Sequence, residues 1–232
     1  WKVDFPADRK TPRPAFGFAS SPLVLGEHVY VQAGAALTKL NKLTGEVVWQ
    51  SLRDDGGMYG SAFSSPYFTK LCGIEQLVVQ TRTHLAGVAP DDGRELWSQE
   101  IPAFRGMNIL TPTVLDDTIF TSSYGGKSLL LRVEKTDAGF TVREAWNHRS
   151  QGYMSTPVII DGHAYLHLRN QRFTCLDLKT GEERWTTKPY GQYWSLVAQG
   201  RRILALDERG DLLLIEASPQ EFKLLDSRHV SD

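Results

Sequence analysis

The chain has 232 residues, of which 41% are hydrophobic and 23% charged, and this globular composition excludes a disordered or collagen-like chain. Lys and Arg together number 26 and Asp and Glu 27, which gives a formal net charge of −1 and argues against nucleic acid as a partner. No apolar run approaches the roughly 18 residues of a transmembrane segment, and Cys72 and Cys175 have neither a disulfide framework nor zinc spacing.

Tryptophans recur along the chain and close similar phrases. Residues 1–6, WKVDFP, begin with Trp1 and align with the segments that follow the later tryptophans. The phrases are LNKLTGEVVW (40–49), VAPDDGRELW (88–97), VEKTDAGFTVREAW (133–146) and LDLKTGEERW (176–185). In three of them a glycine precedes the tryptophan by four residues, whereas the third phrase carries three extra residues. The recurrence indicates an internal repeat.

A second mark recurs with the same period. Ser-Pro or Thr-Pro pairs begin at positions 21, 65, 111 and 156, and Ser195-Leu196 is a weaker fifth copy. Each unit divides into four short runs rich in β-branched and aromatic residues, separated by Gly, Asp or Asn turns. Four antiparallel strands every 40 to 50 residues or so are typical of a β-propeller blade.

We therefore predict an all-β chain of about five blades. The predicted blades span residues 20–52, 64–101, 110–149, 155–189 and 194–230, and residues 1–6 are predicted to be the outer strand of a preceding blade. This organisation favours part of a seven- or eight-bladed ring, and a closed five-bladed ring is the alternative. A β-sandwich also uses short strands, but it does not predict a tryptophan at one place in each fourth strand.

The residues that recur in each unit have a structural interpretation. A tryptophan on the outer strand of each blade is expected to pack between adjacent blades, because that layer is the core of a propeller. Asn41 and Asp177 precede the repeat glycines by four residues and are expected to cap the turn through their side chains. A proline at the start of the first strand is tolerated because its missing N–H lies at a strand beginning.

The phrase LDLKTGEERW and its relatives resemble the tryptophan-docking repeats of propellers of the pyrroloquinoline quinone (PQQ)-like family, over about residues 20–230. This family includes quinoprotein alcohol and sugar dehydrogenases as well as BamB-like and other bacterial propeller proteins. The enzymes carry adjacent cysteines and hold calcium with a Glu, an Asn and a catalytic Asp. Here Cys72 and Cys175 lie in different units, and no acidic cluster matches that pattern. We therefore assign no catalytic residue and no metal ligand.

The connections between consecutive units are the candidate binding site, since they meet near the central channel of a propeller. They are rich in aromatic and glycine residues. We predict a ligand site at the channel mouth, in which Arg105, Tyr153, Tyr193 and Trp194 line one opening. Aromatic side chains provide contact area and the polar groups orientation. The predicted site residues are Tyr59, Arg105, Asn108, Tyr153, Tyr193 and Trp194. The alternative is that these side chains cap the core between blades.

The resemblance implies a binding or scaffold module without catalysis in the bacterial cell envelope, in the periplasm or otherwise outside the cytoplasm. Its partner would be a protein or a small molecule at the channel face, and no cofactor is assigned. The alternative is a fragment of a dehydrogenase that uses PQQ and calcium to oxidise an alcohol or sugar.

Overall fold

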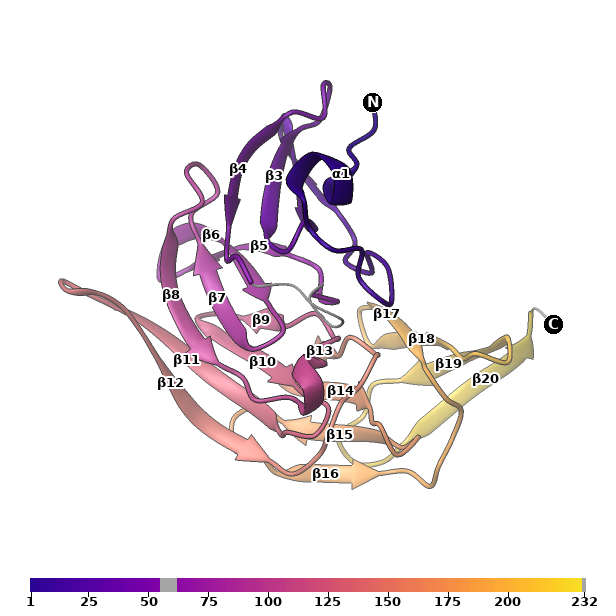
Figure 1. Ribbon diagram of the computed structural model, residues 1–232. Coiled ribbons are helices and arrows are strands. Elements are labelled where there is room, and N and C mark those ends of the chain that lie inside the picture. Colours follow the sequence, from indigo (N-terminus) through magenta and orange to yellow (C-terminus); the bar gives the residue numbers. More distant parts are fainter. Residues whose placement is uncertain (55–61, 231–232) are drawn as a thin grey trace.

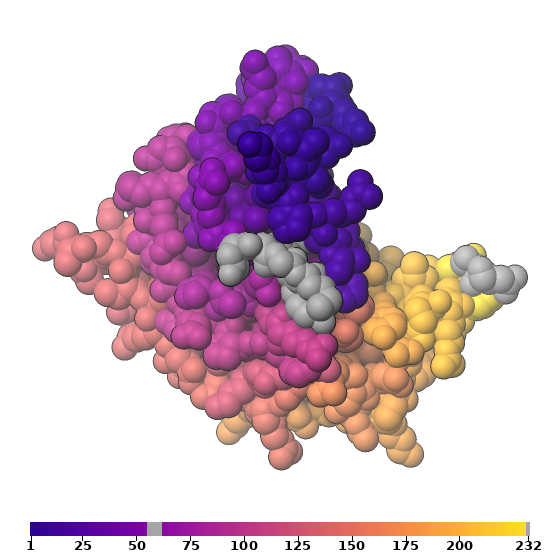
Figure 2. Space-filling view, in the orientation of Figure 1, coloured from indigo at the N-terminus to yellow at the C-terminus, as the bar shows by residue number. Residues whose placement is uncertain are grey.

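The computed structural model describes residues 1–54 and 62–230, which form five four-stranded antiparallel sheets. Within each sheet the strands are neighbours in chain order, and the sheets follow one another around an arc (Figure 1). Consecutive sheets pack directly against each other, as the space-filling view shows (Figure 2). The all-β propeller fold predicted from the repeats is confirmed. No helix in the described ranges is long and apolar enough to cross a membrane.

We number the sheets as blades 1 to 5. Blade 1 contains β1 (Leu23–Leu25), β2 (His28–Gln32), β3 (Leu37–Asn41) and β4 (Val47–Ser51). Blade 2 contains β5 (Tyr67–Leu71), β6 (Ile74–Gln80), β7 (His84–Val88) and β8 (Glu95–Glu100). Blade 3 contains β9 (Thr113–Leu115), β10 (Thr118–Ser122), β11 (Ser128–Thr136) and β12 (Gly139–His148). Blade 4 contains β13 (Val158–Ile160), β14 (His163–His167), β15 (Phe173–Asp177) and β16 (Glu183–Thr186). Blade 5 contains β17 (Ser195–Gln199), β18 (Arg202–Leu206), β19 (Asp211–Glu216) and β20 (Lys223–His229).

The hydrophobic core lies between the blades, as expected for wedge-shaped sheets that each leave two apolar faces. Separate buried clusters join blades 1 and 2, 2 and 3, 3 and 4, and 4 and 5. The outer strand of every blade carries an irregularity in register at the same place, between the third and fourth strands. In the first four blades the extra residue directly precedes the tryptophan, and such a bulge re-aims the side chain that follows it.

The outer tryptophans contact the following blade. The Trp49 indole N–H donates to the carbonyl of Asp91 at 3.0 Å, and Trp146 donates to Leu178 at 2.8 Å. Trp97 differs, because its indole N–H donates to the Gln76 side chain in its own blade at 2.6 Å. The third phrase carries three extra residues, and the β11–β12 hairpin is correspondingly longer. A Cβ on Gly139 at its turn would meet nothing within 4 Å, whereas Gly93 and Gly181 lie against Trp49 and Trp146.

The Ser-Pro and Thr-Pro marks form a second connection between blades that the sequence did not reveal. The Ser21 backbone N–H donates to the Ser65 hydroxyl at 3.0 Å, and the Ser65 N–H donates to the Thr111 hydroxyl at 3.2 Å. The Thr111 N–H donates in turn to the Thr156 hydroxyl at 3.2 Å. The hydroxyls of Ser65, Thr111 and Thr156 therefore each accept a bond from the preceding blade, which explains why Ser or Thr recurs before these prolines.

The N-terminal segment differs from its prediction. Residues 1–6 were expected to be an outer strand, but α1 (Phe5–Arg9) begins within them. Pro6 lacks the N–H that a strand ladder needs but suits a first helical turn, and the Asp4 carboxylate accepts from the Ala7 N–H at 3.3 Å. Trp1 nevertheless contacts blade 1 much as Trp49 and Trp146 contact the blades that follow them, donating to the Lys42 carbonyl at 2.9 Å.

Candidate functional site

The connections between blades share one face of the arc with certain hairpin loops. In an antiparallel four-stranded sheet, the turn between strands two and three and the exit from strand four lie at the same end. This end, which we call the channel face, includes residues 101–112, 149–157 and 187–194, and also the loops 123–127 and 168–172. The site predicted from the connections therefore receives side chains from hairpin loops as well.

A row of four aromatic rings crosses the channel face. The ring centroids of Phe104 and Tyr124 are 5.3 Å apart, those of Tyr124 and Tyr153 5.0 Å, and those of Tyr153 and Tyr193 6.2 Å. These spacings lie within the range at which aromatic pairs attract. The Arg169 guanidinium lies 4.5 Å from the centroid of Tyr124, so a cation covers one ring of this aromatic row.

Two adjoining hollows open beside the aromatic row. The tyrosine hollow has a volume of about 170 Å³ and is lined by Tyr124, Tyr153, Met154, Ser155, His167, Leu168, Arg169, Gln171, Gln192 and Tyr193. The apolar hollow has a volume of about 430 Å³ and is lined by Phe16, Ala19, Phe63, Ser65, Met107, Ile109, Thr111, Tyr153, Met154 and Thr156. The two hollows share Tyr153 and Met154. Polar and apolar groups of a ligand therefore have separate places side by side.

Burial favours the neutral forms of two titratable residues of the tyrosine hollow, Tyr153 and His167. Burial, together with the neighbouring Tyr193 and Tyr124, raises the pKa of Tyr153, so its hydroxyl is a hydrogen-bond donor as well as an acceptor. Burial lowers the pKa of His167, whose ring stacks on Trp194 with centroids 4.6 Å apart. The hollow thus holds a single formal charge, the Arg169 guanidinium.

Tyr153 and Tyr193 lie together in the tyrosine hollow, whereas Trp194 does not. Tyr193 is 46% exposed and Trp194 only 1%. Tyr193 lies in a bend just before β17 and has a left-handed φ of 53°, so the backbone turns between the two side chains. Trp194 belongs to the core between blades 4 and 5, and its carbonyl accepts a hydrogen bond from the Ser155 hydroxyl. For Trp194 the packing alternative is correct.

The remaining predicted residues are dispersed. Arg105 lies in the short 3-10 turn η1 (Phe104–Gly106) and covers the Phe104 ring, with its guanidinium 5.1 Å from the ring centroid. It is not among the residues that line the tyrosine hollow, and a common opening that includes Arg105 stays a prediction. Asn108 is fully buried, and its amide donates to the carbonyls of Arg82 and Ile101 at 3.0 Å each. Tyr59 lies outside the described residues.

Sequence reasoning missed Tyr124, Arg169 and Gln192. Tyr124 and Arg169 lie on loops between the second and third strands of blades 3 and 4. The antiparallel strand order predicts that these loops contribute to the site, because they lie on the same face as the connections between blades. Gln192 directly precedes Tyr193, in a connection whose sequence signal came from its aromatic residues.

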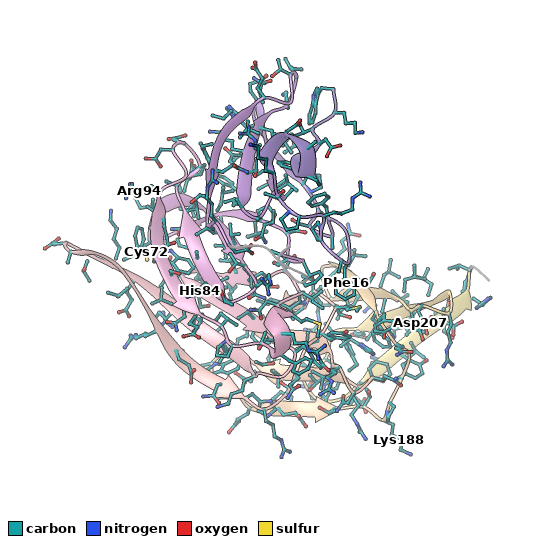
Figure 3. The ribbon with its side chains drawn as sticks, viewed as in Figure 1. Phe16, Cys72, His84, Arg94, Lys188 and Asp207 are labelled. Atoms are coloured by element: carbon teal, nitrogen blue, oxygen red, sulfur yellow. The ribbon has the colours of Figure 1, made fainter. Side chains whose placement is uncertain are left out.

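The residues that line these two hollows do not fit calcium-held PQQ. Neither hollow has an Asp, Glu or Cys in its lining, although calcium needs several converging oxygen ligands. In residues 1–54 and 62–230, no group of three His, Cys, Asp or Glu side chains is placed to hold a metal ion. The two cysteines also do not form the adjacent pair of the quinoprotein enzymes. Cys72 lies well away from Phe16 and hence from the apolar hollow (Figure 3). Cys175 is buried, and burial raises the pKa of its thiol to about 12.

The sequence of the chain matches the family model of outer membrane protein assembly factor BamB over residues 1–187. The chain belongs to this family. It is 30% identical over 158 residues to BamB of Alkalilimnicola ehrlichii, an alignment that covers 64% of this chain and 37% of that protein. It is 23% identical over 201 residues to BamB of Yersinia pestis, covering 83% of this chain and 49% of that protein. The chain thus spans less than half the length of these two curated relatives.

A solved member of the BamB family has the same fold. The crystal structure of BamB from Moraxella catarrhalis superposes with a TM-score of 0.68 at 17% identity, covering 92% of this chain and 66% of that one. At this identity the likeness concerns the fold alone.

Proposed function

We propose that this chain is a protein-binding scaffold module of the bacterial cell envelope, located outside the cytoplasm, and that it serves outer membrane protein assembly. The observation that carries this proposal is the family match over residues 1–187, to proteins named as outer membrane protein assembly factors. The described geometry agrees with a binding role, because the channel face presents exposed and half-buried aromatic rings beside two concave hollows. Clusters of this kind commonly provide most of the energy of a protein interface.

The test is direct binding of the purified chain to outer membrane assembly machinery isolated from a strain that lacks its own BamB. Biolayer interferometry should show saturable binding of the immobilised chain. A Tyr153→Ala/Tyr193→Ala variant should bind at least tenfold more weakly, because each tyrosine at the centre of an interface contributes roughly 1 kcal/mol or more. Leu43→Ala is the matched control, because Leu43 is 72% exposed in the β3–β4 turn at the opposite end of its blade.

Two results would contradict the scaffold role. One is the absence of saturable binding to the machinery by the folded wild-type chain. The other is calcium-dependent binding of PQQ to the purified chain, followed by dye-linked oxidation of an alcohol or sugar, which the dehydrogenase alternative predicts.

A further inference from the structure

We propose that the channel face binds an extended acidic peptide segment of a partner protein, along a groove that runs from the tyrosine hollow outward over blade 4. This proposal rests on the scaffold function above and names the kind of polypeptide that the scaffold recognises.

The groove continues from the tyrosine hollow. A third hollow, with a volume of about 870 Å³, shares Leu168 and Arg169 with it. Its walls come from the connection between β12 and β13, the loop between β14 and β15, and strand β16. Arg149, Arg169 and Arg172 lie along it, and we call it the arginine groove. The channel face therefore changes from apolar, through aromatic, to cationic along three adjoining hollows.

The arginine groove concentrates positive charge in a chain whose net charge is −1. Within residues 1–54 and 62–230, none of its three arginines forms an ion pair. Arg149 and Arg169 are exposed, whereas Arg172 is half-buried and donates to the Thr187 carbonyl at 2.8 Å. Glu183 is the single carboxylate among the described lining residues of this groove and the tyrosine hollow.

Two further carboxylates near His167 already have partners. The Glu208 carboxylate accepts from the Gln192 backbone N–H at 2.9 Å, and the Asp207 carboxylate accepts from the Arg209 and Asp211 N–H groups at 2.9 Å. The guanidinium groups of Arg149 and Arg169 are therefore left to attract anions from solution. Complementary charge of this kind selects an acidic ligand and accelerates its encounter.

The polar side chains between these cations suit a polypeptide. Asn170 and Gln171 are exposed on the β14–β15 loop, and Gln192 is half-buried across the tyrosine hollow. Each carries both a donor and an acceptor, which matches the alternating N–H and C=O groups of an extended backbone. The cations come from two chain segments along a concave track. A single phosphate group would instead need donors that converge on one point, and a membrane surface would need a convex or flat contact.

The order of the hollows also predicts the order of residues in the ligand. The tyrosine hollow lies between the other two, because it shares Tyr153 and Met154 with the apolar hollow and Arg169 with the arginine groove. A large apolar side chain at one end of the segment would occupy the apolar hollow. Acidic side chains that follow would then reach Arg169 and Arg149.

The experiment measures fluorescence anisotropy of a short labelled peptide in which glutamate and glycine alternate after an initial leucine. A matched peptide carries glutamine in place of glutamate. The purified wild-type chain should bind the acidic peptide more tightly, and rising salt should weaken that binding because the charges are exposed. Arg149→Gln/Arg169→Gln should weaken it roughly five- to tenfold, since an exposed ion pair contributes a factor of up to about five. Arg132→Gln/Lys135→Gln, which removes two exposed cations of β11, should leave it unchanged.

The proposal is overturned if the two peptides bind equally or not at all, or if the Arg149→Gln/Arg169→Gln variant binds the acidic peptide as the wild type does. It is also overturned if vesicles containing phosphatidylglycerol bind through these arginines while the acidic peptide does not. Binding of the wild-type chain to the assembly machinery, with no affinity for the acidic peptide, would leave the scaffold function intact and reject only the groove. Arginine-dependent binding of the peptide, without binding to the assembly machinery, would support the groove and reject the scaffold function.

Discussion

Replacing Gly93 with alanine places a methyl group in the layer between blades 1 and 2. Gly93 adopts a φ of +76°, and a Cβ there would lie 2.8 Å from Cδ2 and Cε3 of the Trp49 ring. Gly73 is a matched reference in the same blade, because it also has a φ of +76° but a Cβ there would meet nothing within 4 Å. Both substitutions force an L-residue into the left-handed region, but only Gly93→Ala also brings a methyl group against Trp49 of the neighbouring blade.

The difference between the two variants measures the contact of Trp49 with the following blade. The left-handed conformation costs about 1–2 kcal/mol in either variant. Carbon atoms pack best at about 3.5–4.0 Å, so the 2.8 Å approach requires the indole or the turn to move. Such overpacking typically costs about 1–3 kcal/mol. The 3.0 Å hydrogen bond from the indole to Asp91 is also at risk, and is worth about 1 kcal/mol. We expect Gly93→Ala to lower the free energy of unfolding by about 1–3 kcal/mol more than Gly73→Ala does.

The assay is urea unfolding followed by tryptophan fluorescence and circular dichroism, with both glycine variants also made in a Trp49→Ala background. In that background a Cβ at position 93 no longer meets an indole, so the two variants should be equally destabilised. Equal losses for Gly93→Ala and Gly73→Ala with Trp49 present would refute the reasoning. So would a difference between them that persists after Trp49 is removed.

Three other predictions concern the inner hydrogen bonds, the buried thiol and the histidine behind the tyrosine hollow. Thr111→Val leaves the Ser65 N–H without its acceptor and should lower the free energy of unfolding by about 1 kcal/mol, whereas urea unfolding of Thr111→Ser should match the wild type. Because burial raises the pKa of Cys175 to about 12, a Cys72→Ser variant should show no thiol reactive toward Ellman's reagent near pH 8 until it is unfolded; rapid reaction of the folded protein would contradict this. Burial lowers the pKa of His167, so the unfolded chain binds the proton more readily and stability should fall as the pH drops below about 6.5. His167→Gln should flatten that decline in urea unfolding, and an unchanged pH slope would contradict the assignment.

The identity of the blades was predictable because it depends on local patterns. Strand alternation, hairpin turns and the spacing of the tryptophans are properties of short segments, and they recur often enough for the sequence to predict each blade. The caps are of the same kind: the Asn41 carboxamide accepts from the Leu43 and Thr44 N–H groups, and the Asp177 carboxylate accepts from the Lys179 and Thr180 N–H groups.

The candidate site was only partly predictable, because it depends on which side of the backbone a residue faces and on which loops meet. Tyr193 and Trp194 are neighbours in sequence, yet one lies in the tyrosine hollow and the other in the core. A count of aromatic residues cannot separate them. Asn108 similarly faces inward and joins backbone carbonyls, although its type and position suggested a ligand contact.

The sequence by itself determined the repeat, the four-stranded units and the placement of a tryptophan in the outer strands, because each follows from hydrophobic period and turn chemistry within about 50 residues. Only the tertiary structure decided which polar and aromatic side chains converge. Tyr124, Tyr153 and Tyr193 come from three separate loops, and Arg169 joins them from the β14–β15 loop. Their meeting depends on how neighbouring blades pack, since the angle between packed sheets sets which loop ends lie side by side.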